Sequence, residues 1–135
     1  ELDPLTLKDS VREVMTGGVD VVIDPVGGEA TVAALRTLRD FCRLAVIGFA
    51  SGPIPNLPAN QVLLRNRSVV GVDWGIWAMT HGDEQRNLLD ELLRLVEDGV
   101  LRPTEPTMYP LDDVAQALSD LLNRKVVGKI ALDCS

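Results

Sequence analysis

Val19-Asp20-Val21-Val22-Ile23-Asp24-Pro25-Val26-Gly27-Gly28 is the stretch that decides the fold. Its first six residues form a nearly unbroken apolar run, which is typical of a strand buried on both faces of a parallel sheet. Pro25 to Gly28 turn the chain, and residues 29–38 follow at helical spacing. A second apolar run, residues 43–48, leads into a second glycine-bearing turn that ends at Gly52. The pattern predicts a strand–helix–strand crossover and therefore an α/β fold with a parallel sheet.

The remaining segments also carry helix and strand signals. Apolar residues recur at helical spacing before Gly17-Gly18, and they do so again between Asp83 and Gly99. We expect helices over residues 7–16, 84–98 (capped by Asp83) and 111–123, a helical turn over 61–66, a loop over 53–60, and strands over 68–74, within 101–109 at a sheet edge, and over 126–133.

Size and charge limit the class of protein. The chain has 135 residues and 46% hydrophobic residues, enough for one soluble domain with a core. Its net charge of -7 argues against nucleic acid or an anionic membrane as partner, and no basic run exceeds Arg124-Lys125. Cys42 and Cys134 lack metal-ligand spacing and indicate two reduced thiols in a cytoplasmic protein. Because the chain opens on Glu1-Leu2-Asp3-Pro4, we expect it to be part of a larger protein.

Both glycine turns follow strands, at the edge of a parallel sheet where ligands bind. Gly27-Gly28 is either a plain backbone turn or a bare surface that lets a flat or anionic ligand approach the backbone at the start of a helix. Gly48-Phe49 is either a turn or the floor for a planar ring. Neither stretch is a G-x-G-x-x-G or a P-loop motif.

Few other residues suggest chemistry. Trp74 and Trp77 are interpreted as core or interface residues. His81 is the sole histidine and lies in an expected loop, so a metal or triad role is not favoured. Asp24 and Asp73 are interpreted as strand-ending residues rather than a catalytic carboxylate pair.

Several blocks, taken in order, resemble the medium-chain dehydrogenase/reductase superfamily. The similarity is strongest to its zinc-independent, quinone oxidoreductase-like branch, which is related to the zinc-type alcohol dehydrogenases. The resemblance covers essentially the whole chain. The blocks are residues 19–28, 43–52, 66–72 (Asn-Arg-Ser-Val-Val-Gly-Val), 99–103 (Gly-Val-Leu-Arg-Pro), 109–117 (Tyr-Pro-Leu-Asp-Asp-Val-Ala-Gln-Ala) and 128–130 (Gly-Lys-Ile).

The resemblance implies only the carboxyl-terminal part of such an enzyme. Residues 1–100 match the second half of a doubly wound Rossmann sheet with flanking helices, and residues 101–135 match a tail that returns to the catalytic domain. The catalytic domain and the phosphate-binding fingerprint have no counterpart here. The implied cofactor is NADP or NAD, with NADP favoured, and no zinc is expected.

The resemblance also implies a site and a reaction. The reaction is hydride transfer from NADPH to a quinone or an α,β-unsaturated carbonyl compound, and no residue of this chain resembles a catalytic acid, base or nucleophile. Since the pyrophosphate loop is missing, we expect the chain to be inactive alone. The implied cofactor-binding residues are Val26, Gly27, Gly28, Ala45, Val46, Ile47, Gly48, Phe49, Ala50, Val70, Gly71 and Val72.

Two further readings remain open at this point. The chain could belong to an enoyl reductase module of a larger synthase, or it could be a non-catalytic dimerisation or structural module. In the family the last Rossmann strand pairs across a two-fold axis, which implies a homodimer through residues 68–77. The strand at residues 19–24 is expected to leave its outer edge unpaired.

Overall fold

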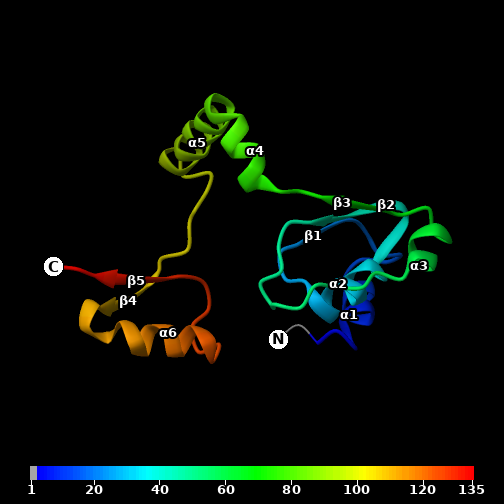
Figure 1. Cartoon of the computed structure of the whole chain (residues 1–135), viewed down its shortest axis with the longest axis horizontal. Coiled ribbons are helices and arrows are strands. Elements are labelled where there is room, and N and C mark those ends of the chain that lie inside the picture. Colours follow the sequence, from blue (N-terminus) through cyan, green and yellow to red (C-terminus); the bar gives the residue numbers. More distant parts are fainter. Residues whose placement is uncertain (1–2) are drawn as a thin grey trace. The chain divides into compact units, whose positions relative to one another are not determined.

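The computed structural model describes residues 3–135 (Figure 1). Contacts divide the chain into two compact units, Glu1–His81 and Gly82–Ser135. The predicted boundary at residue 100 concerns which domain of a longer protein each part joins, and it stays a prediction. None of the helices within the described residues is both long and apolar enough to cross a membrane.

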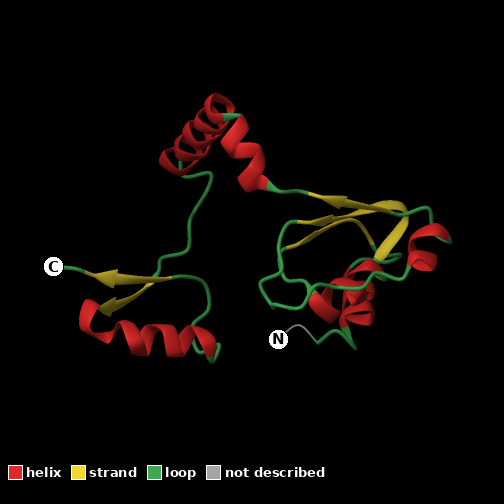
Figure 2. Ribbon diagram, in the orientation of Figure 1, coloured by secondary structure: helices red, strands yellow, loops and turns green. Residues whose placement is uncertain are grey.

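The first unit is a parallel α/β structure, as predicted (Figure 2). Its three strands lie in the order β1-β2-β3, and both strand pairs are parallel. Helix α2 packs on β1 and β2 and also contacts α1. The elements are α1 (Leu7–Val14), β1 (Val19–Asp24), α2 (Gly28–Leu35), β2 (Leu38–Val46), α3 (Ala59–Leu63), β3 (Ser68–Gly71) and α4 (Trp74–Thr80).

A small apolar core holds this unit together. Leu35, Leu38 and Leu44 are buried between α2 and the sheet, with Val19 and Val22 packed against them. Burial of each leucine side chain contributes about 1.5–3 kcal/mol. The sequence predicts strands that are buried on both faces of the sheet. In the structure one face of β1 is exposed, since Val21 and Ile23 are 52% and 67% exposed. Strand β1 lies at a sheet edge, as predicted.

The end of α2 and the start of β2 lie elsewhere than the sequence predicts. The helix ends at Leu35 rather than Leu38, and β2 begins at Leu38 rather than Arg43. Leu38 pairs with Val19 in the sheet and is only 3% exposed. Helical spacing alone puts Leu38 on the helix, whereas pairing with a distant strand moves it into the sheet.

The third strand is shorter than predicted. It ends at Gly71 instead of Trp74, and Asp73 begins a helix because its Oδ1 accepts a hydrogen bond from the Ile76 amide at 3.0 Å. Trp74 and Trp77 therefore lie on α4, with ring centroids 4.6 Å apart. Residues 74–77 cannot extend a strand across a dimer axis as predicted.

The helical turn expected at 61–66 is α3, which begins two residues earlier.

The second unit contains α5 (Gly82–Glu97), β4 (Thr107–Pro110), the 3-10 turn η1 (Leu111–Asp113), α6 (Val114–Leu122) and β5 (Ile130–Asp133). The edge strand and the helices are confirmed, and β4 pairs with β5 in parallel. Helix α5 begins at Gly82, so Asp83 lies in its first turn rather than at the cap. The terminal strand begins at Ile130 rather than Val126.

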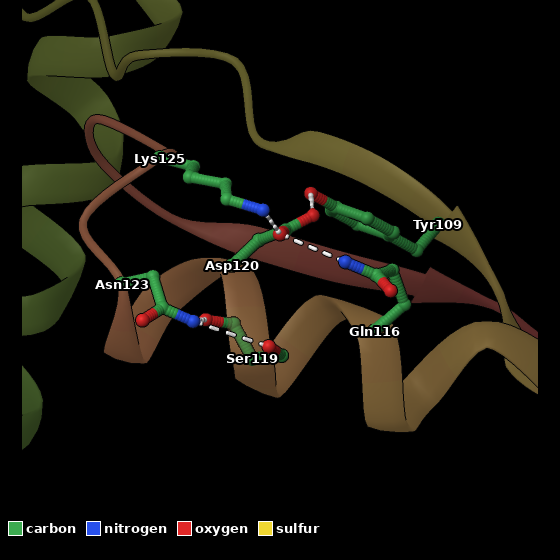
Figure 3. A network of polar contacts seen from close by, with 6 residues as sticks. All are labelled: Tyr109, Gln116, Ser119, Asp120, Asn123 and Lys125. Atoms are coloured by element: carbon green, nitrogen blue, oxygen red, sulfur yellow. Dashed lines mark hydrogen bonds and ion pairs between the residues drawn. The ribbon is translucent and has the colours of Figure 1, made fainter.

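A carboxylate joins three parts of the second unit (Figure 3). Asp120 on α6 accepts hydrogen bonds from Tyr109 of β4 at 3.1 Å and from Gln116 at 2.9 Å. Lys125 Nζ lies 3.1 Å from Oδ1 of the same carboxylate. The hydrogen bond from Lys125 is the main cause that lowers the pKa of Asp120 below its ordinary value. The network ties α6 to β4 and to the turn that follows the helix.

Candidate functional site

A cavity of about 650 Å³ opens at the carboxyl ends of β2 and β3. Parallel register brings these ends together, since Val46 pairs with both Asp24 and Gly71. Many of the predicted cofactor residues lie here as one group. The lining residues are Val46, Ile47, Gly48, Phe49, Gly71, Val72, Asp73, Trp74 and Gly75.

The remaining predicted residues lie beside the cavity rather than on its wall. Ala45 and Val70 pair with each other one position inside the strands. The backbone amide of Ala50 donates to the Pro25 carbonyl at 3.0 Å, and the Ser51 amide donates to the Val26 carbonyl at 2.8 Å. These bonds join the turn after β1 to the turn after β2. The two glycine turns therefore form one structural unit.

Gly27 and Gly28 allow this close contact. Their φ angles are +81° and +61°, a region that favours glycine. A Cβ on Gly27 would lie 3.0 Å from Phe49 Cδ1 and 3.1 Å from the Pro53 carbonyl oxygen. The Gly28 amide already donates to that same Pro53 oxygen at 3.0 Å. The structure thus assigns both glycines a packing role beneath the Phe49 turn.

Asp24 fixes the turn after β1. Its carboxylate is buried, and Oδ1 accepts hydrogen bonds from the amides of Val26 at 2.9 Å and Gly27 at 3.2 Å. Oδ2 accepts a hydrogen bond from the hydroxyl of Thr31, which is fully buried in α2. These partners account for Asp24 as a structural residue that ends the strand, as interpreted from the sequence.

The bonds of Asp24 also change the expected ligand chemistry at Gly27-Gly28. A carboxylate already lies at the amino terminus of α2, the position that an anionic ligand group would take. The amides of both glycines are bonded within the protein. A phosphate at this turn would therefore meet a like charge and no free donors from these two residues. The geometry suits an uncharged, flat group near Phe49 better than an anion.

Asp73, Trp74 and Gly75 line the cavity although the sequence reasoning did not place them there. Asp73 caps α4, and this turn brings Trp74 back toward the strand ends. The signal was present as an acid three residues before Ile76, the spacing of an N-cap and the amide that it binds. The cap was missed because the run from Ser68 to Val72 is typical of a strand, and the predicted strand was extended to Trp74.

His81 terminates α4. Its Nδ1 lies 2.9 Å from both the Trp77 carbonyl oxygen and the Thr80 hydroxyl, and its ring stacks on Trp77 with centroids 5.0 Å apart. Among residues 3–135 no group of three His, Cys, Asp or Glu side chains lies close enough to hold a metal ion. His81 therefore has local partners that explain its position without a ligand.

The chain is similar in sequence to several known oxidoreductases. The family model described as zinc-binding dehydrogenase matches residues 5–132. Quinone oxidoreductase-like protein 2 of Bos taurus is 36% identical over 128 residues, which are 94% of this chain and 37% of that protein. A highly reducing polyketide synthase of a Dothideomycetidae species is 30% identical over 126 residues, which are 93% of this chain and 5% of the synthase.

Solved structures share the fold. A mycobacterial protein determined in complex with NADPH has a TM-score of 0.78 and 30% identity, over 98% of this chain and 40% of that chain. The chain thus spans little more than a third of the length of the bovine relative and two fifths of the mycobacterial one.

Proposed function

The chain belongs to the zinc-binding dehydrogenase family, and we propose that it forms the nicotinamide-side wall of the cofactor site in an NAD(P)H-dependent oxidoreductase. The proposed reaction is hydride transfer to a quinone or an α,β-unsaturated carbonyl compound. The observation that carries the proposal is the cavity at the strand ends, where residues 46–49 meet residues 71 and 72. Ligands of open parallel sheets bind at these ends.

The cavity fits a flat ring better than a charged group. Its volume of about 650 Å³ lies within the range of small-molecule sites, about 300–1,000 Å³. Phe49 offers an aromatic face, and Gly48 and Gly71 leave the backbone bare on either side. Asp73 is the one acid in the lining, and its carboxylate is already engaged by the Ile76 amide.

In this proposal the residues of the chain position and shield the ring. Phe49 and Trp74 line the cavity with half-exposed aromatic side chains, against which the ring would pack. The bound nicotinamide supplies the hydride. No side chain of the lining is assigned a proton-transfer role.

Zinc does not fit the described part of the chain, despite the name of the family. Residues 3–135 contain no group of potential metal ligands, so no step is assigned to a metal here. The absence of zinc from the whole protein stays a prediction, because the relatives are much longer than this chain.

Several finer points are part of the same proposal. We propose NADP as the cofactor because the mycobacterial relative was solved with NADPH, although a similar alcohol dehydrogenase is NAD-dependent. Since the chain spans 37% of its bovine relative, we propose that it does not turn over alone. The free thiols Cys42 and Cys134 support a cytoplasmic location. We also propose a homodimer that forms through the outer edge of β3. Residues 74–77 would contribute to this interface as part of α4.

An enoyl reductase module of a larger synthase is the second candidate. The observation that favours it is the 30% identity with a polyketide synthase over nearly the whole chain. The same wall would then serve the reduction of an enoyl thioester. A non-catalytic dimerisation module is a third reading, which the same assay tests.

The test is cofactor-dependent reduction by the full-length protein, with a quinone, a simple enone and an enoyl thioester as substrates. Gly71→Leu adds a bulky side chain at the cavity lining without steric overlap, because a Cβ there meets nothing within 4 Å. We expect the KM for NADPH to rise about tenfold or more, equivalent to about 1.4 kcal/mol, with unchanged thermal stability. Gly82→Leu is the control, since Gly82 is equally open but lies outside the cavity.

Each outcome of this assay separates the readings. Turnover of the enoyl thioester alone would favour the synthase module over the quinone reductase. No turnover and no NADPH binding would favour the structural module. If Gly71→Leu and Gly82→Leu behave alike, the cavity is not the nicotinamide site.

A further inference from the structure

Six basic side chains gather around a second cavity, of about 590 Å³. The chain as a whole has 20 acidic and 13 basic residues, yet Asp40 is the one acid in this lining. The local excess of positive charge therefore runs against the charge of the whole chain. The six are Lys8, Arg12, Arg36, Arg39, Arg65 and Arg67. We call the cavity that they line the basic cavity.

The basic cavity lies at the amino ends of the strands. Leu38 and Arg39 begin β2, and Arg67 immediately precedes β3. The proposed nicotinamide wall lies at the opposite, carboxyl ends of the same strands. The six residues of β1, rising about 3.3 Å each, separate these two ends by about 20 Å. One small ligand cannot fill both places.

Only part of the positive charge is neutralised within the protein. Arg65 pairs with Asp40 at 3.3 Å, and Arg39 pairs with Asp20. Arg67 donates to the backbone carbonyls of Leu38 and Arg39. Within residues 3–135, the side chains of Lys8, Arg12 and Arg36 have no hydrogen-bond or ion-pair partner. These three cations are the free charges of the cavity.

Arg67 shows the effect of this crowding. Burial is the first cause that lowers its pKa, and repulsion from Arg65 is the second, with a smaller contribution from Arg12. An anion in the basic cavity would offset that repulsion. Guanidinium groups suit phosphate in particular, because their planar donors can bind two of its oxygens at once.

A buried acceptor adds a second requirement. Gln61 lines the basic cavity, and its Oε1 is buried without a hydrogen-bond partner in the described part of the chain. Burying such an atom is unfavourable unless a donor reaches it. A hydrogen phosphate ion carries both negative charge and one hydroxyl donor, and a sugar phosphate carries hydroxyl donors on the sugar beside its phosphate group. Chloride and sulfate carry no such donor at neutral pH.

From these groups we infer that the basic cavity binds a phosphate group, either as free phosphate or on a small phosphate ester. The cavity volume lies in the range of small-molecule sites, about 300–1,000 Å³. The net charge of -7 opposes the long phosphate backbone of a nucleic acid.

The sequence alone could not reveal this site. Its cations come from α1, the turn after α2, the start of β2 and the segment between α3 and β3. They are spread over residues 8–67, and none of these segments is a basic run. Packing of α1 and α3 beside the start of β2 brings them to one cavity.

The test is titration calorimetry of the full-length protein with inorganic phosphate at low ionic strength. We expect one saturable site with a Kd below about 1 mM, equivalent to about -4 kcal/mol. Arg12→Gln and Arg36→Gln should each weaken binding by about threefold to tenfold, because each removes one charge-assisted hydrogen bond. Arg86→Gln on α5 is the matched control and should leave the Kd unchanged, since Arg86 lies outside the cavity.

Further arms define the ligand. Ribose 5-phosphate that binds more tightly than free phosphate would identify a phosphate ester as the ligand, and the reverse order would identify the free ion. Sulfate is expected to bind more weakly, and saturating NADPH is expected to leave the phosphate Kd unchanged.

Five results would overturn the inference. They are absence of saturation, equal affinity for sulfate, displacement of phosphate by NADPH, an equal loss in Arg86→Gln, and tighter competitive binding by a short RNA. Thermal unfolding of each variant shows whether a lost signal comes from misfolding. Arg36→Lys then keeps the charge and should retain most of the affinity.

Discussion

The Asp24 carboxylate at the end of β1 accepts a hydrogen bond from the Thr31 hydroxyl in α2, and both side chains are buried. The other oxygen of Asp24 accepts hydrogen bonds from the amides of Val26 and Gly27. One side chain therefore sets both the path of the turn and the position of the helix. Phe49, which packs on Gly27, depends on this arrangement for its place at the cavity.

Thr31→Val removes the hydroxyl and keeps the shape of the side chain. We expect the free energy of unfolding to fall by about 1–3 kcal/mol, because Asp24 loses a buried donor. In the full-length protein the Kd for NADPH should also rise. Thr37→Val is the matched control, since Thr37 is 3% exposed and donates to the Ala34 carbonyl at 2.7 Å, away from the turn. An unaltered NADPH affinity in Thr31→Val would disconnect this hydrogen bond from the site.

Gly27→Ala tests the contact between the two turns. Gly27 and Gly52 both have positive φ angles, +81° and +92°, so alanine is strained at either position. Only at Gly27 does the added Cβ meet Phe49 and Pro53. We expect Gly27→Ala to be less stable than Gly52→Ala by about 1–3 kcal/mol in chemical denaturation. Equal stabilities would mean that the contact does not hold Phe49 in place.

Asp120 makes the second unit sensitive to acid. Its folded pKa is lowered, chiefly by the hydrogen bond from Lys125. The stabilisation is therefore fully present above the unfolded value, about 3.9, and is lost as pH falls through the lower folded pKa. In thermal unfolding, Asp120→Asn should lower the Tm near neutral pH and flatten the loss of Tm below about pH 4. Asp112→Asn, in the preceding 3-10 turn, should keep the wild-type profile.

The proposed dimer predicts an effect of charge on α4. Ile76 is 64% exposed and lies within residues 68–77. Ile76→Lys should raise the dimer dissociation constant about tenfold, equivalent to about 1.4 kcal/mol, in sedimentation of the full-length protein. Val127→Lys is the control, because Val127 is 94% exposed but lies in the second unit. A wild-type protein that sediments as a monomer at tens of micromolar contradicts the dimer.

The parallel sheet and its two glycine turns could be predicted because local patterns encode them. Residues 19–24 read as a buried-type strand, and the glycines that follow mark the turn. The start of β2 could not be predicted, because Leu35 and Leu38 also fit one helical face. Pairing of Leu38 with Val19 decides the boundary, and that contact is not local.

The candidate site was predictable in part for the same reason. Residues 46–49 and 71–72 follow apolar runs, so their place at strand ends could be inferred. Trp74 reaches the cavity because Asp73 caps α4. The sequence hides this cap, because Asp73 lies between an apolar run and two tryptophans. The hydrogen bond from Thr31 to Asp24 forms only when α2 packs against the end of β1. Contacts of this kind arise only from packing.

The most direct measurement is a crystal structure of the full-length protein with NADPH. The account predicts that the nicotinamide ring lies against Gly48 and Phe49, within about 4 Å, and that Gly71 and Val72 form the adjacent wall. It also predicts that no phosphate of NADPH contacts the amides of Gly27 or Gly28. A nicotinamide ring bound away from residues 46–49, or a pyrophosphate on the Gly27-Gly28 turn, would contradict the central claim.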